Sequence, residues 1–125
     1  MASNVAIHAY GVAAALDRLR RKDLKSRRMA SWTWLFVSLA GWIVFLHVTE
    51  IMVWAFAYTL GSAMTDLPSA MYFSAVTYTT TGYGDLVLPQ SWRLVGAVEA
   101  LTGILMCGWS TGVFFAVLSR SLQNR

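Results

Sequence analysis

Two long apolar stretches constrain the fold of this chain more than any other feature. Residues 32–60 are interrupted only by His47 and Glu50, and residues 94–119 only by Glu99. Each stretch exceeds the roughly 20 residues that a helix needs to cross a hydrocarbon core about 30 Å thick. Hydrophobic residues make up 57% of the chain and charged residues only 13%, which is unusual for a soluble domain. The sequence therefore predicts an all-α membrane protein with two transmembrane helices.

The basic residues are distributed unevenly about these stretches. Seven Lys or Arg residues lie between positions 18 and 28, and Arg120 and Arg125 follow the second stretch, whereas only Arg93 lies in between. By the positive-inside rule both termini are cytoplasmic, and the connecting segment faces outward from the cell membrane. We expect the basic N-terminal residues to contact anionic lipid headgroups and not nucleic acid, because they adjoin a span and lack a recognition pattern.

Residues 1–30 are predicted to form a cytoplasmic, basic, amphipathic segment. Within it, residues 5–25 can form a helix with one apolar stripe, made of Val5, Ala9, Val12, Leu16 and Leu19. Such a helix would lie on the cytoplasmic leaflet. The alternative is a partly disordered basic tail, because Gly11 weakens the helix.

The segment between the spans contains a shorter helical pattern. Asp66 or Leu67 can cap a helix whose first position is Pro68, where the missing amide hydrogen does no harm. A helix over about 67–79 measures about 18 Å, which reaches halfway into a bilayer. We therefore expect a re-entrant helix, followed by residues 80–84 as an extended return path.

The return path carries the motif with the most chemical content. Residues 79–85 read Thr-Thr-Thr-Gly-Tyr-Gly-Asp. Glycine adopts left-handed conformations with little strain, so Gly82 and Gly84 allow successive carbonyls to face one axis and replace the water shell of a potassium ion. The alternative is an ordinary glycine-rich turn, which seven consecutive matching positions between two apolar spans argue against.

This run resembles the signature filter of potassium channels. Over about residues 60–119 the chain is similar to the pore domain of the tetrameric potassium channel superfamily, in its two-transmembrane prokaryotic form. The resemblance implies a pore domain over 31–120, with helices at about 32–60 and 92–119, and a short cytoplasmic tail at 121–125. Because one loop cannot enclose a pore and the chain has no internal repeat, it also implies a homotetramer with three identical subunits as partners.

The resemblance assigns residues to the ion path. The carbonyls of Thr80, Thr81, Gly82 and Tyr83, with the Thr80 hydroxyl, would bind K+, and the Gly84 carbonyl would face the outer mouth. Tyr83 would pack against two aromatic residues of the re-entrant helix. These and the other residues expected to support the filter are Tyr72, Phe73, Val76, Asp85 and Trp92.

Two positions depart from the common pattern of the family. Thr81 stands where many members carry Val or Ile, and its extra hydroxyl is expected to affect water access and inactivation but not selectivity. Val76 stands where some members carry a glutamate that pairs with the aspartate after the filter. Asp85 must then find another partner, either the Tyr72 hydroxyl or the Trp92 indole.

Three ionisable residues inside the spans require partners, because an ionisable group in a membrane costs at least about 2.5 kcal/mol. Glu50 and Glu99 lie at similar depth, and His47 is one turn from Glu50. We expect His47, Glu50 and Glu99 to join Ser74, Thr77 or Tyr78 in a polar network behind the filter. Burial opposes ionisation of the carboxylates, so the network either makes gating depend on pH or has a structural role alone.

The second span contains three glycines, at 103, 108 and 112. The resemblance places Gly103 near a gating hinge, whereas Gly108 and Gly112 have the spacing that lets helices pack closely. Both accounts stay open. The same alignment implies that Ile104, Cys107, Thr111 and Phe115 line the inner cavity and gate.

The sequence thus predicts a potassium-selective channel that conducts K+ passively, with no catalytic activity and no cofactor beyond the permeant ion. Two alternatives belong to other classes: a subunit of a potassium transporter, and a non-conducting membrane scaffold or regulatory subunit. Transporters of that kind chain four degenerate repeats, and a scaffold leaves the intact motif unexplained. Protons, lipid, membrane tension and filter inactivation are all candidate gating stimuli.

Overall fold

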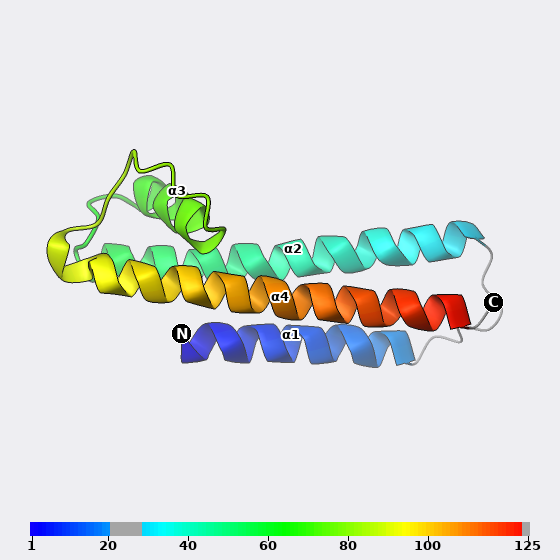
Figure 1. Ribbon diagram of the computed structural model, residues 1–125. Coiled ribbons are helices and arrows are strands. Elements are labelled where there is room, and N and C mark those ends of the chain that lie inside the picture. Colours follow the sequence, from blue (N-terminus) through cyan, green and yellow to red (C-terminus); the bar gives the residue numbers. More distant parts are fainter. Residues whose placement is uncertain (21–28, 124–125) are drawn as a thin grey trace.

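The structure is a computed structural model that describes residues 1–20 and 29–123 (Figure 1). Four α-helices and one short 3₁₀ helix make up these residues. They are α1 (Ala2–Arg20), α2 (Met29–Leu60), α3 (Leu67–Tyr78), η1 (Gln90–Trp92) and α4 (Arg93–Gln123).

The two long helices, α2 and α4, run in opposite directions (Figure 1). Two segments are long and apolar enough to cross a membrane, Trp32–Leu60 and Gln90–Ser119. Most of their side chains remain uncovered by the described part of the chain, as Val44, Leu101 and Phe115 do. Such faces suit contact with lipid or with another protein chain.

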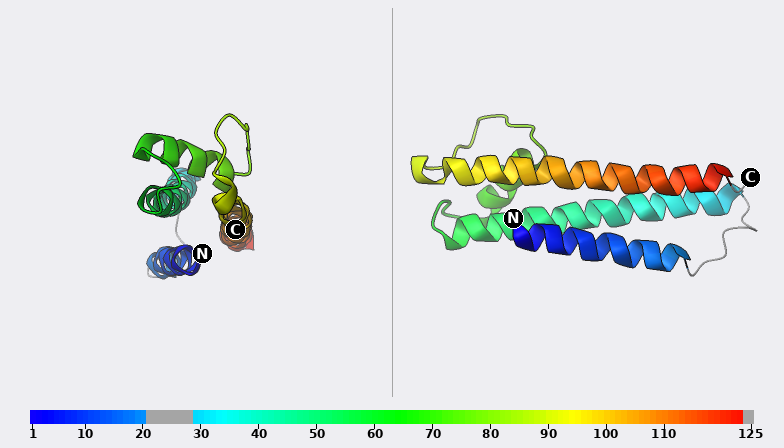
Figure 2. Two further views of the ribbon diagram at one scale, coloured as in Figure 1. Left: turned by 90° about the vertical axis from the view of Figure 1, so that its left-hand side faces the viewer. Right: turned by 60° about the horizontal axis from the view of Figure 1, so that its bottom comes forward.

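Helix α3 lies between α2 and α4 at one end of the molecule (Figure 2). The Asp66 side chain caps it by accepting a hydrogen bond from the Ser69 amide at 2.8 Å. The helix begins at Leu67, so Pro68 takes the second position and not the first. Buried residues recur at four-residue spacing along α3, as Ala70, Ser74 and Tyr78, and this stripe faces the long helices.

The core lies where α3 meets the C-terminal half of α2 and the N-terminal half of α4. Tyr58 is fully buried, stacks on Trp54 at 6.1 Å and meets the edges of Phe73 and Trp92 at 5.4 and 6.1 Å. Met106 is buried on the α4 side of the same cluster. Aromatic packing therefore joins α2 to α3 and to η1, which leads directly into α4.

Helix α1 packs along the two long helices, an arrangement that the sequence did not predict. It runs alongside the N-terminal half of α2 and the C-terminal half of α4, and its first turn reaches Glu50 of α2 (Figures 1 and 2). The Trp42 indole donates to the Gly11 carbonyl at 3.0 Å, and Gly11 packs directly against Leu46.

The buried face of α1 also differs from the apolar stripe expected from the sequence. It consists of Asn4, His8, Gly11 and Val12, because polar partners on the long helices select it. The end of the expected helix, residues 21–25, lies outside the described residues.

Candidate functional site

The signature loop, residues 79–85, has an alternating backbone. Thr80, Gly82 and Gly84 all adopt positive φ angles, of 59°, 56° and 77°. Left-handed residues at every second position turn successive carbonyl groups toward the same side of an extended chain, which a regular strand does not allow. The two glycines were expected in this conformation, whereas Thr80 adopts it against the usual preference of a β-branched residue.

Hydrogen bonds to the end of α3 hold the first half of the loop. The amides of Thr81 and Gly82 both donate to the Val76 carbonyl, at 2.9 and 3.3 Å. The Thr79 hydroxyl donates to the Ala75 carbonyl at 2.7 Å and lies 2.9 Å from the Thr81 hydroxyl. The extra hydroxyl at position 81 therefore has a partner within its own chain.

Asp85 ends the loop and has the first of its two expected partners. The Tyr72 hydroxyl donates to Asp85 Oδ2 at 2.7 Å, and this bond holds the pKa of Asp85 below its usual value. Trp92 lies elsewhere, with its ring against Tyr58 and Gly61. The alternative that the sequence left open is thus settled in favour of Tyr72.

A small cavity separates the loop from α3. Val76, Tyr72 and Phe73 line one side of it, and Gly82, Gly84 and Asp85 line the other. Tyr83 is 71% exposed, so its ring is not enclosed by α3 of the same chain. Phe73 presents its ring edge to Tyr58, as the core requires.

The first buried carboxylate, Glu99, links three helices. The Tyr58 hydroxyl donates to Glu99 Oε2 at 2.6 Å, and Ser74 is hydrogen-bonded to Glu99 Oε1. The Ser74 hydroxyl also lies 3.0 Å from the Ile51 carbonyl. Residues from α2, α3 and α4 thus meet at one carboxylate that solvent does not reach.

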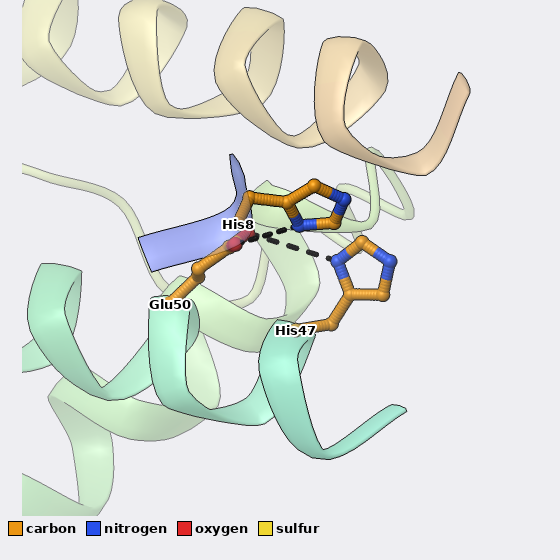
Figure 3. A group of neighbouring side chains, drawn as sticks. All are labelled: His8, His47 and Glu50. Carbon is orange, nitrogen blue, oxygen red and sulfur yellow. Dashed lines mark hydrogen bonds and ion pairs between the residues drawn. The ribbon is translucent and has the colours of Figure 1, made fainter. Parts of the chain in front are cut away.

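The second buried carboxylate, Glu50, gathers side chains from further elements (Figure 3). His8 Nδ1 lies 2.8 Å from Glu50 Oε1, and the Tyr78 hydroxyl donates to Glu50 Oε2. His47 Nδ1 lies 3.0 Å from the Tyr78 hydroxyl. Ser110 Oγ lies 3.1 Å from His8 Nε2 and 3.2 Å from His47 Nε2, so α4 closes the cluster.

The single polar network expected from the sequence is therefore two clusters. Ser74 lies in the Glu99 cluster. Tyr78 and His47 lie in the Glu50 cluster, and Thr77 lies in neither.

Sequence reasoning missed four members of these clusters. They are Asn4, His8, Tyr58 and Ser110. The available signal was the four-residue spacing of Asn4 and His8, which places two polar side chains on one helical face.

The residues expected at the cavity and gate lie along α4. Ile104, Cys107, Thr111 and Phe115 are all exposed, on a face that no other described helix covers. Gly103 is buried, and a Cβ there would overlap the Tyr78 carbonyl, whereas Gly108 and Gly112 have nothing within 4 Å. Close packing therefore occurs at Gly103, and α4 continues through it without interruption.

Comparison with known proteins adds two relationships. The profile of a family described as "Ion channel" matches residues 32–120. The potassium voltage-gated channel protein Shal of Drosophila melanogaster is 35% identical over 72 residues, which are 56% of this chain and 12% of that relative. The chain thus corresponds to a small part of the relative. No solved structure matches it.

Proposed function

The chain belongs to the ion channel family, in its two-transmembrane potassium-channel form, and we propose that it conducts K+ passively and selectively across the cell membrane as a homotetramer. The family is one of membrane proteins and not of enzymes.

One observation carries the proposal: the alternating backbone of the signature loop. With Thr80, Gly82 and Gly84 at positive φ, the intervening residues can direct their carbonyl oxygens to a common axis. Backbone oxygens in this arrangement replace the hydration shell of K+. The ion sites are then the carbonyls of residues 80–83 with the Thr80 hydroxyl, and Gly84 faces the outer mouth.

The position of α3 supports the same path. Its last residue, Tyr78, contacts Glu50, which lies about 15 Å along α2 from the outer end at Leu60. The carboxyl end of a helix carries a partial negative charge. The carboxyl end of α3 would therefore lie near mid-membrane, where its partial negative charge would stabilise a cation on the cytoplasmic side of the signature loop.

A homotetramer supplies what one chain lacks. The signature loop is exposed along its whole length in the single chain, and so is the face of α4 that carries Ile104 and Phe115. Four copies around one axis would enclose the loops as a filter and these faces as an inner cavity. The basic residues 18–28 would then lie on the cytoplasmic side, near anionic lipid.

Reconstitution into planar bilayers tests the function. We expect unitary currents that barium blocks. With K+ on one side of the bilayer and Na+ on the other, the reversal potential should show strong selectivity for K+. A transporter subunit would give no unitary currents, and a scaffold would give no flux. Equal currents of Na+ and K+, or a monomer by cross-linking in bilayers, would contradict the proposal.

Two glycine variants isolate the loop backbone. An added Cβ has open space at both Gly82 and Gly41, but only Gly82 has a positive φ, of 56°. Alanine in that conformation costs roughly 1–2 kcal/mol per residue, so we expect Gly82→Ala to lower the K+ current about tenfold or more. The matched control Gly41→Ala should conduct like the wild type. Equal currents in both variants would show that conduction does not depend on the backbone conformation at Gly82.

A further inference from the structure

The chain has 2 histidines, and the fold brings both to one carboxylate. His8 Nδ1 lies 2.8 Å from Glu50 Oε1, and His47 Nδ1 lies 3.7 Å from Glu50 Oε2. The ligand atoms of the three residues all lie within 4.8 Å of one another (Figure 3). His8 and Glu50 are fully buried.

We propose that His8, His47 and Glu50 form a binding site for a divalent transition-metal ion such as Zn²⁺. Two imidazole nitrogens and a carboxylate oxygen are a donor set that Zn²⁺ takes in proteins, with a fourth position left for water. Helical bundles build such sites from His and Glu three residues apart on one helix together with ligands from facing helices. His47 and Glu50 have this spacing on α2, and His8 comes from α1.

The distances admit a metal ion after a small adjustment. Tetrahedral bonds of 2.0–2.1 Å place neighbouring ligand atoms about 3.3 Å apart. The 3.7 Å between His47 Nδ1 and Glu50 Oε2 is too long for a hydrogen bond but close to this edge. The 2.8 Å between His8 and Glu50 would open by about 0.5 Å to reach the same edge.

The surrounding hydrogen bonds have the polarity that metal ligands need. A metal on both Nδ1 atoms leaves a hydrogen on each Nε2, and the Ser110 oxygen lies 3.1 and 3.2 Å from these two atoms, where it can accept both. The Tyr78 hydroxyl donates to the carboxylate.

Without a cation, these groups lack one hydrogen. The ring formed by His8, Ser110, His47, Tyr78 and Glu50 has five contacts. Neutral imidazoles and an ionised carboxylate supply only four hydrogens to it. A metal bound to both Nδ1 atoms would replace two of the five contacts, His8 to Glu50 and His47 to Tyr78, and the hydrogens present then suffice for the other three.

The charge around the site also fits. The negative Glu50 carboxylate attracts the ion, and the carboxyl end of α3, at Tyr78, adds partial negative charge beside it. His47 is 17% exposed in the single chain, whereas Glu50 is fully buried.

Cobalt binding to the wild-type protein tests the site. The protein is purified without a histidine tag, stripped with a chelator and titrated with Co²⁺. We expect one Co²⁺ per chain, with the strong visible absorption of four-coordinate cobalt, no thiolate charge-transfer band, and displacement by Zn²⁺. This measurement needs no ion flux, so its result is independent of the proposed conduction.

Variants assign the ligands. Ser110→Ala should weaken Co²⁺ binding about 10–100-fold, as loss of an outer partner does, and His8→Gln and His47→Gln should each weaken it further. Glu99→Gln alters the other buried carboxylate and should bind like the wild type. Absence of a one-to-one site in the wild type, wild-type affinity in either histidine variant, or loss of binding in Cys107→Ser would overturn the proposal. The wild-type spectrum decides the question even where a variant fails to fold.

Discussion

At the scale of single residues, the Tyr72 side chain lowers the pH at which Asp85 takes up a proton. The Tyr72 hydroxyl donates to the Asp85 carboxylate and lowers its pKa. The bond thus contributes stability that is fully present above the pKa of an aspartate carboxyl in the unfolded chain, about 3.9. This stability is lost as pH falls through the lowered pKa of Asp85 in the folded protein. Between pH 5 and 8 this contribution is constant.

The variant Tyr72→Phe removes that hydroxyl and keeps the ring. We expect the pKa of Asp85 to rise toward its usual value, measured by carbon NMR of the side-chain carboxyl during an acid titration in nanodiscs. Asp66 is an internal control, because the Ser69 amide lowers its pKa and Tyr72 is not among its contacts. An Asp85 titration that is the same in both proteins would show that the hydroxyl does not hold the carboxylate.

Partners of the buried carboxylates were predictable only in part. Glu50 and Glu99 stood out because charged residues are costly in an apolar span, and hydroxyl groups on the neighbouring helix were the obvious donors. His8 could not be assigned, since it lies 42 positions from Glu50 in the sequence. Only the docking of α1 along the spans brings it there.

At the scale of helices, α3 and α4 approach each other most closely at Gly103. A Cβ at this position would overlap the carbonyl of Tyr78, so the two helices pack backbone against backbone. Overpacking a tight contact costs typically 1–3 kcal/mol. We expect Gly103→Ala to lower the free energy of unfolding by about this amount.

Equilibrium unfolding in mixed micelles measures the effect of Gly103→Ala, and Gly112→Ala is its matched control. Nothing lies within 4 Å of a Cβ added at Gly112, so this variant should be neutral or slightly stabilising through helix propensity. If the two variants have the same stability, α3 does not depend on the absence of a side chain at position 103.

The helices differ in how far their sequences predict them. Apolar length marks α2 and α4, and the Asp66 cap with Pro68 marks the start of α3, because these signals are local. Helix α1 has local helical character, but its buried face is chosen by Glu50, Trp42 and Ser110, which lie on other helices. The apolar stripe therefore indicated only part of the buried face, with Val12 buried and Val5 partly buried.

At the scale of the whole molecule, the Glu99 cluster joins the helices around the outer core. Tyr58 from α2 and Ser74 from α3 both hydrogen-bond to the α4 carboxylate. The Ser74 hydroxyl has one hydrogen but lies near two acceptors, Glu99 and the Ile51 carbonyl. A group at position 99 that can both accept from Tyr58 and donate to Ser74 satisfies every member.

Glutamine is such a group, and alanine is not. We expect Glu99→Gln to keep the free energy of unfolding within about 1 kcal/mol of the wild type. Glu99→Ala should lose several kcal/mol, because the buried Tyr58 hydroxyl loses its acceptor, at a cost of about 1–3 kcal/mol, and a cavity replaces the buried side chain. Equilibrium unfolding of both variants in mixed micelles measures the difference. Equal losses would mean that the ionised carboxylate itself is required, and no loss in either would mean that aromatic packing alone holds α2, α3 and α4 together.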